Sequence, residues 1–204
     1  MPAGIKRPGR PAGTSDTRER ILASARELFA QNGIDRTSIR AVAAGAGVDA
    51  ALVHHYFGTK EQLFAAAIHI PVDPMSVLVP MREVPVDELG FKLPAVLLPL
   101  WDSELGAGLI ATLRSLVAGG EVSLARSFLE EVVAAEIAPR VDNPAGTGMI
   151  RAQFFASQLM GVVMARYIVK LEPFASLPAE QIVQTIGPNL QRYLTGDLPD
   201  GLAQ

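Results

Sequence analysis

Residues 37–60, TSIRAVAAGAGVDAALVHHYFGTK, restrict the possible fold more than any other stretch of this chain. Ala43 is small enough for two helices to cross closely, Gly47 can take a positive φ in the turn, and Val48 is apolar at the entry to the next helix. This spacing predicts a helix-turn-helix, which places its second helix in a DNA groove. The residues expected on its inward face are Val42, Ala46, Val48, Val53 and Tyr56.

Start and stop signals of further helices surround this stretch. The first helix is predicted over about Asp16–Asn32, because Asp16 with Glu19 resembles a capping box and an Asn-Gly pair follows as a left-handed stop. Residue 37 or 38 is expected to cap the second helix, and Asp49 the third, over about 50–57. A second capping box at residues 59–62 opens a fourth helix that runs to about residue 69.

Charge is divided unevenly along the 204 residues. Residues 1–62 carry nine Lys or Arg and six Asp or Glu (+3), whereas residues 63–204 carry nine and fifteen (−6). The basic part contains the helix-turn-helix, and the acidic part would repel DNA. Cysteine is absent, which excludes disulfides and thiolate metal sites and favours a reducing compartment, by default the cytoplasm. The longest apolar stretches, Leu93–Trp101 and Leu159–Val169, are too short or interrupted to cross a bilayer, so no membrane partner is expected.

Beyond residue 64 the sequence is acidic, apolar and punctuated by prolines, without repeats or strand-like alternation. It predicts a short helix near residues 75–81 and longer ones at about 87–101, 102–118, 121–137, 145–171 and 178–194. The predicted fold class is therefore all-α with nine or ten helices. We expect a flexible basic arm over residues 1–14, a DNA-binding domain over 15–64 and a C-terminal domain over 65–204.

The arm, MPAGIKRPGRPAGT, contains three prolines, three glycines and three cations without an acid. Its Gly-Arg-Pro triplet at residues 9–11 resembles the core of an AT-hook, although Pro8 stands where an arginine is expected and Arg7 is displaced by one position. Two interpretations are open. The arm is a solvated terminus, or Arg7 and Arg10 contact a narrow A·T minor groove.

Three segments carry a resemblance to a known family. RERILASARELFAQNG, TSIRAVAAGAGV and HHYFGTKEQL resemble the N-terminal domain of the tetracycline-repressor (TetR) family of bacterial transcription regulators, over about Thr17–Phe64. The tail Tyr56-Phe57-x-x-Lys60-Glu61-x-Leu63 is the most specific part. LWDS, ARYIVKLEP and LQRYLTG resemble a C-terminal domain found in the same family, less specifically.

The resemblance implies a set of DNA contacts. Tyr56 and Lys60 would lie against phosphates, and Lys60 would add its charge to a helix N-terminus that already favours an anion. Ala50, Ala51 and Leu52 offer only apolar contact to thymine methyl groups, so direct readout falls mainly on Arg40, which can pair with guanine, and on His54. The residues expected to face the major groove are Thr37, Ser38, Arg40, Ala50, Ala51, Leu52, His54 and His55.

The resemblance also implies a C-terminal cavity for a small-molecule effector and a homodimer. Ala145–Leu171, which is apolar nearly all round, and Pro178–Leu194 would form a four-helix bundle across a two-fold axis. Ser157, Gly161 and Ala165 would let a neighbouring helix approach closely. Pro94 and Pro99 would kink one helix and free carbonyls toward the cavity, or have no functional role. Each candidate for the lining could equally be core: Phe91, Leu97, Leu98, Trp101, Leu113, Leu116, Phe128, Phe154 and Gln158.

Other classes of protein fit less well. His54 and His55 are adjacent, so their side chains diverge on a helix, and the spacings of zinc proteases, serine hydrolases and P-loops are absent. Neither an enzyme nor a cofactor or metal site is expected. The remaining alternative is a helical ligand-binding or dimerisation protein that has lost DNA binding, because the start of the recognition helix is rich in alanine. The sequence therefore predicts a transcription regulator that binds a palindromic operator, and the resemblance to the family implies that it is a repressor.

Overall fold

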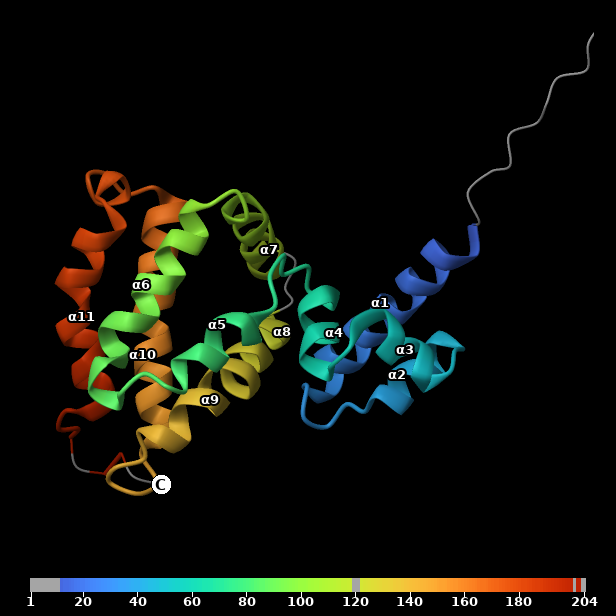
Figure 1. Ribbon diagram of the computed structural model, residues 1–204, viewed down its shortest axis with the longest axis horizontal. Coiled ribbons are helices and arrows are strands. Elements are labelled where there is room, and N and C mark those ends of the chain that lie inside the picture. Colours follow the sequence, from blue (N-terminus) through green and yellow to red (C-terminus); the bar gives the residue numbers. More distant parts are fainter. Residues whose placement is uncertain (1–11, 119–121, 200, 203–204) are drawn as a thin grey trace, which may run out of the picture.

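The computed structural model describes residues 12–118, 122–199 and 201–202, and all regular elements of this part are helices (Figure 1). The π-helical segment η2 joins α8 to α9, so the eleven α labels correspond to ten helical rods, which confirms the predicted all-α class. The helices are α1 (Ala12–Asn32), α2 (Ile39–Ala46), α3 (Ala50–Phe57), α4 (Lys60–Ala67), α5 (Pro74–Met81), α6 (Leu89–Asp102), α7 (Gly106–Ala118), α8 (Val122–Ser127), η2 (Phe128–Ala134), α9 (Ala135–Ile137), α10 (Gly148–Val163), the π-helical η4 (Met164–Val169) and α11 (Ala179–Thr195).

The predicted caps of the short helices are present. The Ser38 hydroxyl accepts a hydrogen bond from the backbone N–H of residue 41, and the Asp49 carboxylate accepts one from that of residue 51. Thr59 and Gln62 form the reciprocal capping box of α4. Gly47 takes φ +65° at the end of α2, which an L-residue with a side chain adopts only with strain. These local signals set the turns of the helix-turn-helix.

The predicted start of α1 is wrong. The helix begins at Ala12, four residues before Asp16. Asp16 does not cap the helix but lies within it, where its carboxylate is 3.9 Å from the Arg20 guanidinium one turn later. Residues 12–14, which were predicted as part of the flexible arm, are helical, and Arg7 and Arg10 lie outside the described residues.

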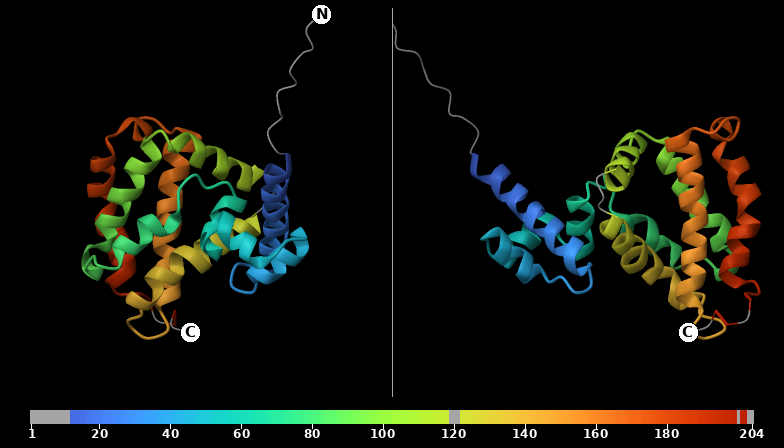
Figure 2. Two further views of the ribbon diagram at one scale, coloured as in Figure 1. Left: turned by 45° about the vertical axis from the view of Figure 1, so that its right-hand side comes forward. Right: turned by 180° about the vertical axis from the view of Figure 1, so that it is seen from behind.

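The helices form two groups, which Figure 1 shows side by side and Figure 2 shows from two further directions. α1 to α4 make the N-terminal group. α6, α10 and α11 stand at the opposite end, and α5, α7, α8 and α9 lie between. One hydrophobic core joins the groups, because Leu124 and Val132 of the C-terminal group are buried together with Phe29 and Phe64 of the N-terminal one. The helix-turn-helix thus rests on a core that the C-terminal group helps to form.

The last helix, α11, packs against other helices of the same chain. α11 packs along α6, and the two cross closely where Gly90 meets Gln191 and Gly187 meets Phe91. The stretch Pro178–Leu194 is expected to contact a second subunit, but its apolar residues Ile182, Val183 and Leu190 are buried against α6 and α10 of the same chain. Sequence periodicity could not distinguish these partners. The exposed positions of α11 are polar except for Pro188: Glu180, Gln181, Gln184, Thr185, Asn189, Arg192 and Thr195.

Gly148–Val169 is one continuous helical stretch of 22 residues that is long and apolar enough to cross a membrane by length and composition. The bent pair Val86–Asp102 and Gly106–Leu116 passes the same test together. The apolar stretch Leu159–Val169 was expected to be too short to cross a bilayer, but it belongs to a longer helix that begins eleven residues before Leu159. A core helix covered on several sides has the same composition. Here α10 packs on α11 and η2 and carries the buried Arg151.

Arg151 is the largest of the fully buried side chains, with 2% of its surface exposed. Its guanidinium donates hydrogen bonds to Thr147 Oγ1 at 3.0 Å and to the carbonyl oxygens of Tyr193 and Gly196 at 3.1 and 2.8 Å. A cation at this place satisfies carbonyls that the end of α11 leaves without intrahelical partners. Arg151 therefore fastens the end of α11 to the start of α10.

We expect Arg151→Met to lower the free energy of unfolding by about 1–3 kcal/mol or more, since buried carbonyls lose their donor. Urea denaturation followed by circular dichroism measures this change. The control is Lys92→Met, which removes an exposed cation 3.8 Å from Glu88 and should change the stability by less than about 1 kcal/mol. Equal effects of the two substitutions would contradict the role of Arg151.

Candidate DNA interface and ligand cavity

α2 and α3 lie at the end of the molecule farthest from α11 (Figure 1). Ser38, Arg40, Ala51, His54 and His55 are exposed on them, and Ala50, Leu52 and Tyr56 are half-buried. α2 packs on α1 and α3, and α3 packs on α4. The structure thus leaves most of the sequence-predicted DNA contacts exposed or half-exposed on α2 and α3. Arg40 lies in the first turn of α2.

Two predicted contacts have other roles in the structure. Thr37 is 3% exposed, and its hydroxyl donates to the carbonyl oxygens of Leu28 and Gly33 at 3.2 and 2.7 Å. Its side chain therefore faces the interior and not a DNA groove. The Lys60 ammonium donates to Ile34 O at 2.8 Å and lies 3.5 Å from the next carbonyl oxygen, so it holds the α1–α2 loop to the start of α4.

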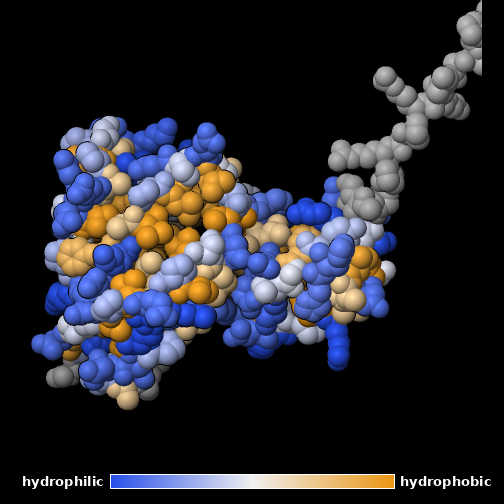
Figure 3. All heavy atoms as spheres, in the orientation of Figure 1, coloured by the Kyte–Doolittle hydropathy of each residue, from blue (hydrophilic) through white to orange (hydrophobic). Residues whose placement is uncertain are grey.

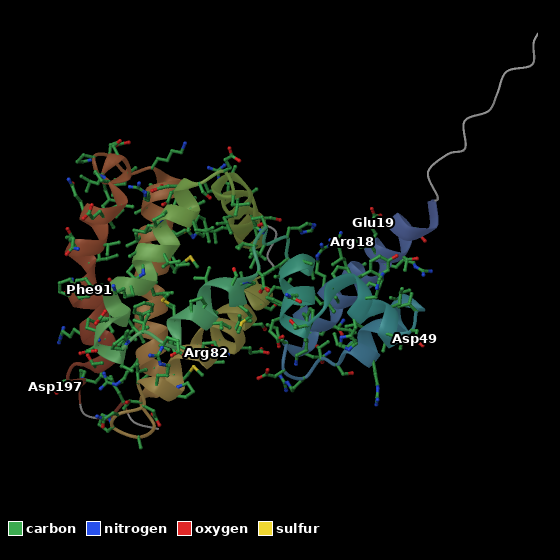
Figure 4. The ribbon with its side chains drawn as sticks, viewed as in Figure 1. Arg18, Glu19, Asp49, Arg82, Phe91 and Asp197 are labelled. Carbon is green, nitrogen blue, oxygen red and sulfur yellow. The ribbon has the colours of Figure 1, made fainter. Side chains whose placement is uncertain are left out.

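The aromatic end of α3 is fixed by local contacts. His54 Nδ1 lies 2.9 Å from Gly58 O, and the His55 and Tyr56 rings meet edge to face at 5.8 Å. Arg18 of α1 places its guanidinium 5.3 Å from the centre of the Phe57 ring. Figure 4 shows Arg18 on α1 and Asp49 at the turn between α2 and α3. Sequence reasoning did not select Arg18, because its position depends on how α1 crosses α3.

An apolar cavity of about 210 Å³ lies within the C-terminal group, between α5, α6, α7, η2 and α10. Figure 3 shows apolar side chains gathered in a hollow on this part of the surface. The described lining includes Thr112 as its one hydroxyl, which donates to His69 O at 2.6 Å. Across the described residues, no three His, Asp or Glu side chains converge as a metal site would require. The arrangement suits an apolar small molecule.

Five of the nine predicted lining residues border this cavity: Leu97, Trp101, Leu113, Leu116 and Phe128. The other four do not line it. Phe91 lies on the side of α6 that faces α11, against Gly187 (Figure 4), and Leu98 is buried in a neighbouring core cluster. Phe154 stacks on Tyr193 with ring centres 5.6 Å apart, and Gln158 is exposed.

The wall of the cavity is in direct contact with the N-terminal group. Phe128 lines the cavity and stacks on Phe64 of α4, with ring centres 6.4 Å apart and planes 6° from parallel. Phe64 in turn meets Phe29 of α1 edge to face at 5.2 Å. Three residues beyond Phe128, Glu131 Oε2 accepts a hydrogen bond from Asp35 N at 2.5 Å. No sequence pattern indicated Glu131, whose partner is 96 residues away.

A second contact joins the cavity to α4. His69, at the end of α4, takes φ +61°, and its carbonyl oxygen accepts the hydrogen bond of the lining residue Thr112. The Arg26 guanidinium of α1 donates to Ala67 O at 3.1 and 2.9 Å and lies 3.5 Å from His69 Nδ1. The end of α4 is therefore held from both sides, by α1 and by the cavity wall.

A cluster of polar side chains lies next to Trp101, which lines the cavity. The Tyr167 ring stacks on Trp101 at 5.4 Å, and its hydroxyl donates to Asp102 Oδ1 at 3.0 Å. Burial, and then Asp102, raise the pKa of Tyr167 to about 12, so the phenol stays protonated as a donor. Arg166 pairs with Asp102 at 3.1 Å and also donates to Leu177 O at 2.6 Å.

Comparison with known proteins gives matches in both groups. Residues 21–67 match the family described as "Bacterial regulatory proteins, tetR family", and residues 87–194 match the "Tetracyclin repressor-like, C-terminal domain". An HTH-type transcriptional repressor of Mycobacterium tuberculosis is 34% identical over 135 residues, 66% of this chain and 58% of that protein. The chain thus matches less than two thirds of the length of this relative. The HTH-type regulator UidR of Escherichia coli is 38% identical over 52 residues, 26% of each chain.

Among solved structures, a TetR-family regulator from Streptomyces coelicolor A3 is 32% identical, and the alignment covers 92% of this chain and 99% of that one with a TM-score of 0.47. A regulator from Rhodococcus sp. Rha1 is 23% identical over 89% of this chain and 99% of its own, with a TM-score of 0.48. The C-terminal family match alone covers more than half of the 204 residues, and the N-terminal match contains the helix-turn-helix. The chain therefore belongs to the TetR family of bacterial regulatory proteins.

Proposed function

We propose that this protein is a transcription regulator of the cytoplasm that represses by binding a palindromic operator as a homodimer and releases it when a small molecule occupies the C-terminal cavity. The observation that carries the proposal is the exposed face of α2 and α3, whose turns are fixed by Ser38, Gly47 and Asp49. The family consists of transcription regulators and not of enzymes. The relative from M. tuberculosis is described as a repressor, which supports the direction of regulation proposed here.

The proposed residues of the DNA interface have two kinds of role, direct contact with DNA and positioning of the residues that make this contact. Arg40 would pair with a base, because its exposed guanidinium stands at the start of α2 and can donate twice to guanine. His54, His55 and Tyr56 would complete the contact from α3. Lys60 would act indirectly, by holding the loop that sets the position of α2.

The proposed dimer uses α10 and the polar outer face of α11. On α10, Gly161 is exposed, and a Cβ at this position would meet no atom of another described element within 4 Å. A helix of a second copy could therefore approach closely there, as the spacing of Ser157, Gly161 and Ala165 suggests. A two-fold axis would place two α3 helices on half-sites about 34–36 Å apart, which is one turn of B-DNA.

The proposed release of DNA depends on the contacts between the cavity wall and α4. An occupant that presses on Phe128 would shift Phe64, and with it the tilt of α4 and the spacing of the two recognition helices. Glu131 would transmit the same movement to the α1–α2 loop through Asp35. Binding of the operator would then weaken, and the size of this effect is limited by the difference between the occupant's affinities for the two arrangements of α4.

Selection of bound fragments from random duplex DNA tests the proposed function. We expect enrichment of a rough palindrome, with a binding constant that falls steeply as salt is raised. Retention on heparin or random DNA at low salt, lost at high salt, is the accompanying measurement. A protein that enriches no sequence and binds DNA equally weakly at every salt concentration would support the alternative, a ligand-binding or dimerisation protein without DNA binding.

Arg40→Ala is expected to cost about 1–3 kcal/mol of binding free energy at one operator position and to relax specificity there. Titrations against a panel of single-base operator variants measure the loss. The control is Arg114→Ala, which removes an exposed arginine of α7, far from α2 and α3. A loss that is uniform across the panel would instead make Arg40 a phosphate contact.

Glu131→Gln is expected to weaken operator binding several-fold, because the charged acceptor that holds Asp35 N is lost and the α1–α2 loop is less well ordered. Fluorescence anisotropy with the selected operator measures the change. Glu130→Gln alters the neighbouring carboxylate of the same π-helical segment and should leave the affinity unchanged. If both variants bind like the original protein, the Glu131 contact has no part in DNA binding.

A further inference from the structure

We propose that the effector is a small uncharged molecule whose buried part is apolar. This inference rests on the proposed function, in which the cavity holds the effector. Its main support is the lining, in which no described residue is Lys, Arg, His, Asp or Glu. A carboxylate or ammonium in this place would lose its hydration without gaining an opposite charge, which is strongly unfavourable.

The one hydroxyl of the described lining, that of Thr112, already has a partner. The Thr112 hydroxyl gives its hydrogen to His69 O, so it cannot donate a second one to an occupant. The ion pair of Arg166 with Asp102 is outside the lining, and its guanidinium lies 5.4 Å from the centre of the Tyr167 ring. Its charges neutralise each other, and Arg166 donates to two backbone carbonyls as well. The cavity therefore offers an occupant shape and apolar surface, and no charge.

The size and shape of the cavity restrict the class of effector further. An apolar cavity of about 150 Å³ in another protein holds benzene, and the cavity here has about 210 Å³. The rings of Trp101, Phe128 and Phe155 contribute to its wall, and flat aromatic molecules pack well against such rings. The buried part of the effector is thus one or two rings, or a branched aliphatic group of the same size, with any remainder at the open mouth seen in Figure 3.

A matched pair of dyes tests this class on the full-length protein without DNA. N-phenyl-1-naphthylamine is uncharged, and 8-anilino-1-naphthalenesulfonate has the same ring skeleton with one negative charge. Trp101 is the single tryptophan of the sequence and borders the cavity, so energy transfer from it to a bound dye reports occupancy of this site. We expect the uncharged dye to bind with a Kd at least tenfold lower than that of the sulfonate.

Ala156→Phe should fill the cavity and weaken binding of the uncharged dye at least tenfold, since Ala156 is part of its wall. Val96→Phe adds the same ring to an exposed position of α6, where 41% of the valine is exposed, and should leave dye binding unchanged. Thermal melting establishes that both variants fold. If Ala156→Phe does not fold, competition replaces it: naphthalene should displace the uncharged dye from the unmodified protein, and 1-naphthoate should not.

Each outcome bears on the proposal. Equal or tighter binding of the sulfonate, displacement by naphthoate, or absence of energy transfer from Trp101 would overturn the assignment of an uncharged apolar effector. Operator binding is measured separately. A protein that binds the uncharged dye as expected but selects no operator would keep the ligand class and refute the proposed DNA function, whereas the reverse result would refute only the ligand class.

Discussion

The loop between α1 and α2 is held by its own Thr37 and by side chains of α4 and η2, and the placement of α2 and α3 depends on it. Gly33 O accepts from Thr37, Ile34 O accepts from Lys60, and Asp35 N donates to Glu131. A loop of this kind would otherwise leave backbone groups without partners next to the core, at a cost comparable to lost hydrogen bonds. Because Lys60 begins α4 and Glu131 belongs to the C-terminal group, both groups meet at this loop.

The sequence predicts the helix-turn-helix well because its boundaries are set by local chemistry. Ser38, Asp49 and Thr59 cap helices through amides only two or three residues away, and Gly47 provides the left-handed turn. Contacts within a helical turn leave a signature in consecutive residues. The error at Asp16 has the same origin, since an acid can cap a helix or pair with a cation one turn later within it.

The cavity was predicted less accurately because its lining depends on how distant helices face one another. Leu97 and Leu98 are adjacent and equally apolar, yet Leu97 borders the cavity and Leu98 is buried in the core beside it. Phe91 was expected at the cavity, but Gly187 gives its ring a place against α11. The contacts of Lys60 could not be predicted for the same reason. Its carbonyl partners lie 25 and 26 residues away in the sequence, so the residues around Lys60 do not indicate them.

The cavity also has an energetic consequence for regulation. An occupant removes apolar surface of the wall from water, which stabilises the arrangement of the wall that fits the occupant. Since Phe128 belongs both to this wall and to the stack on Phe64, the arrangement that an occupant stabilises includes the position of α4.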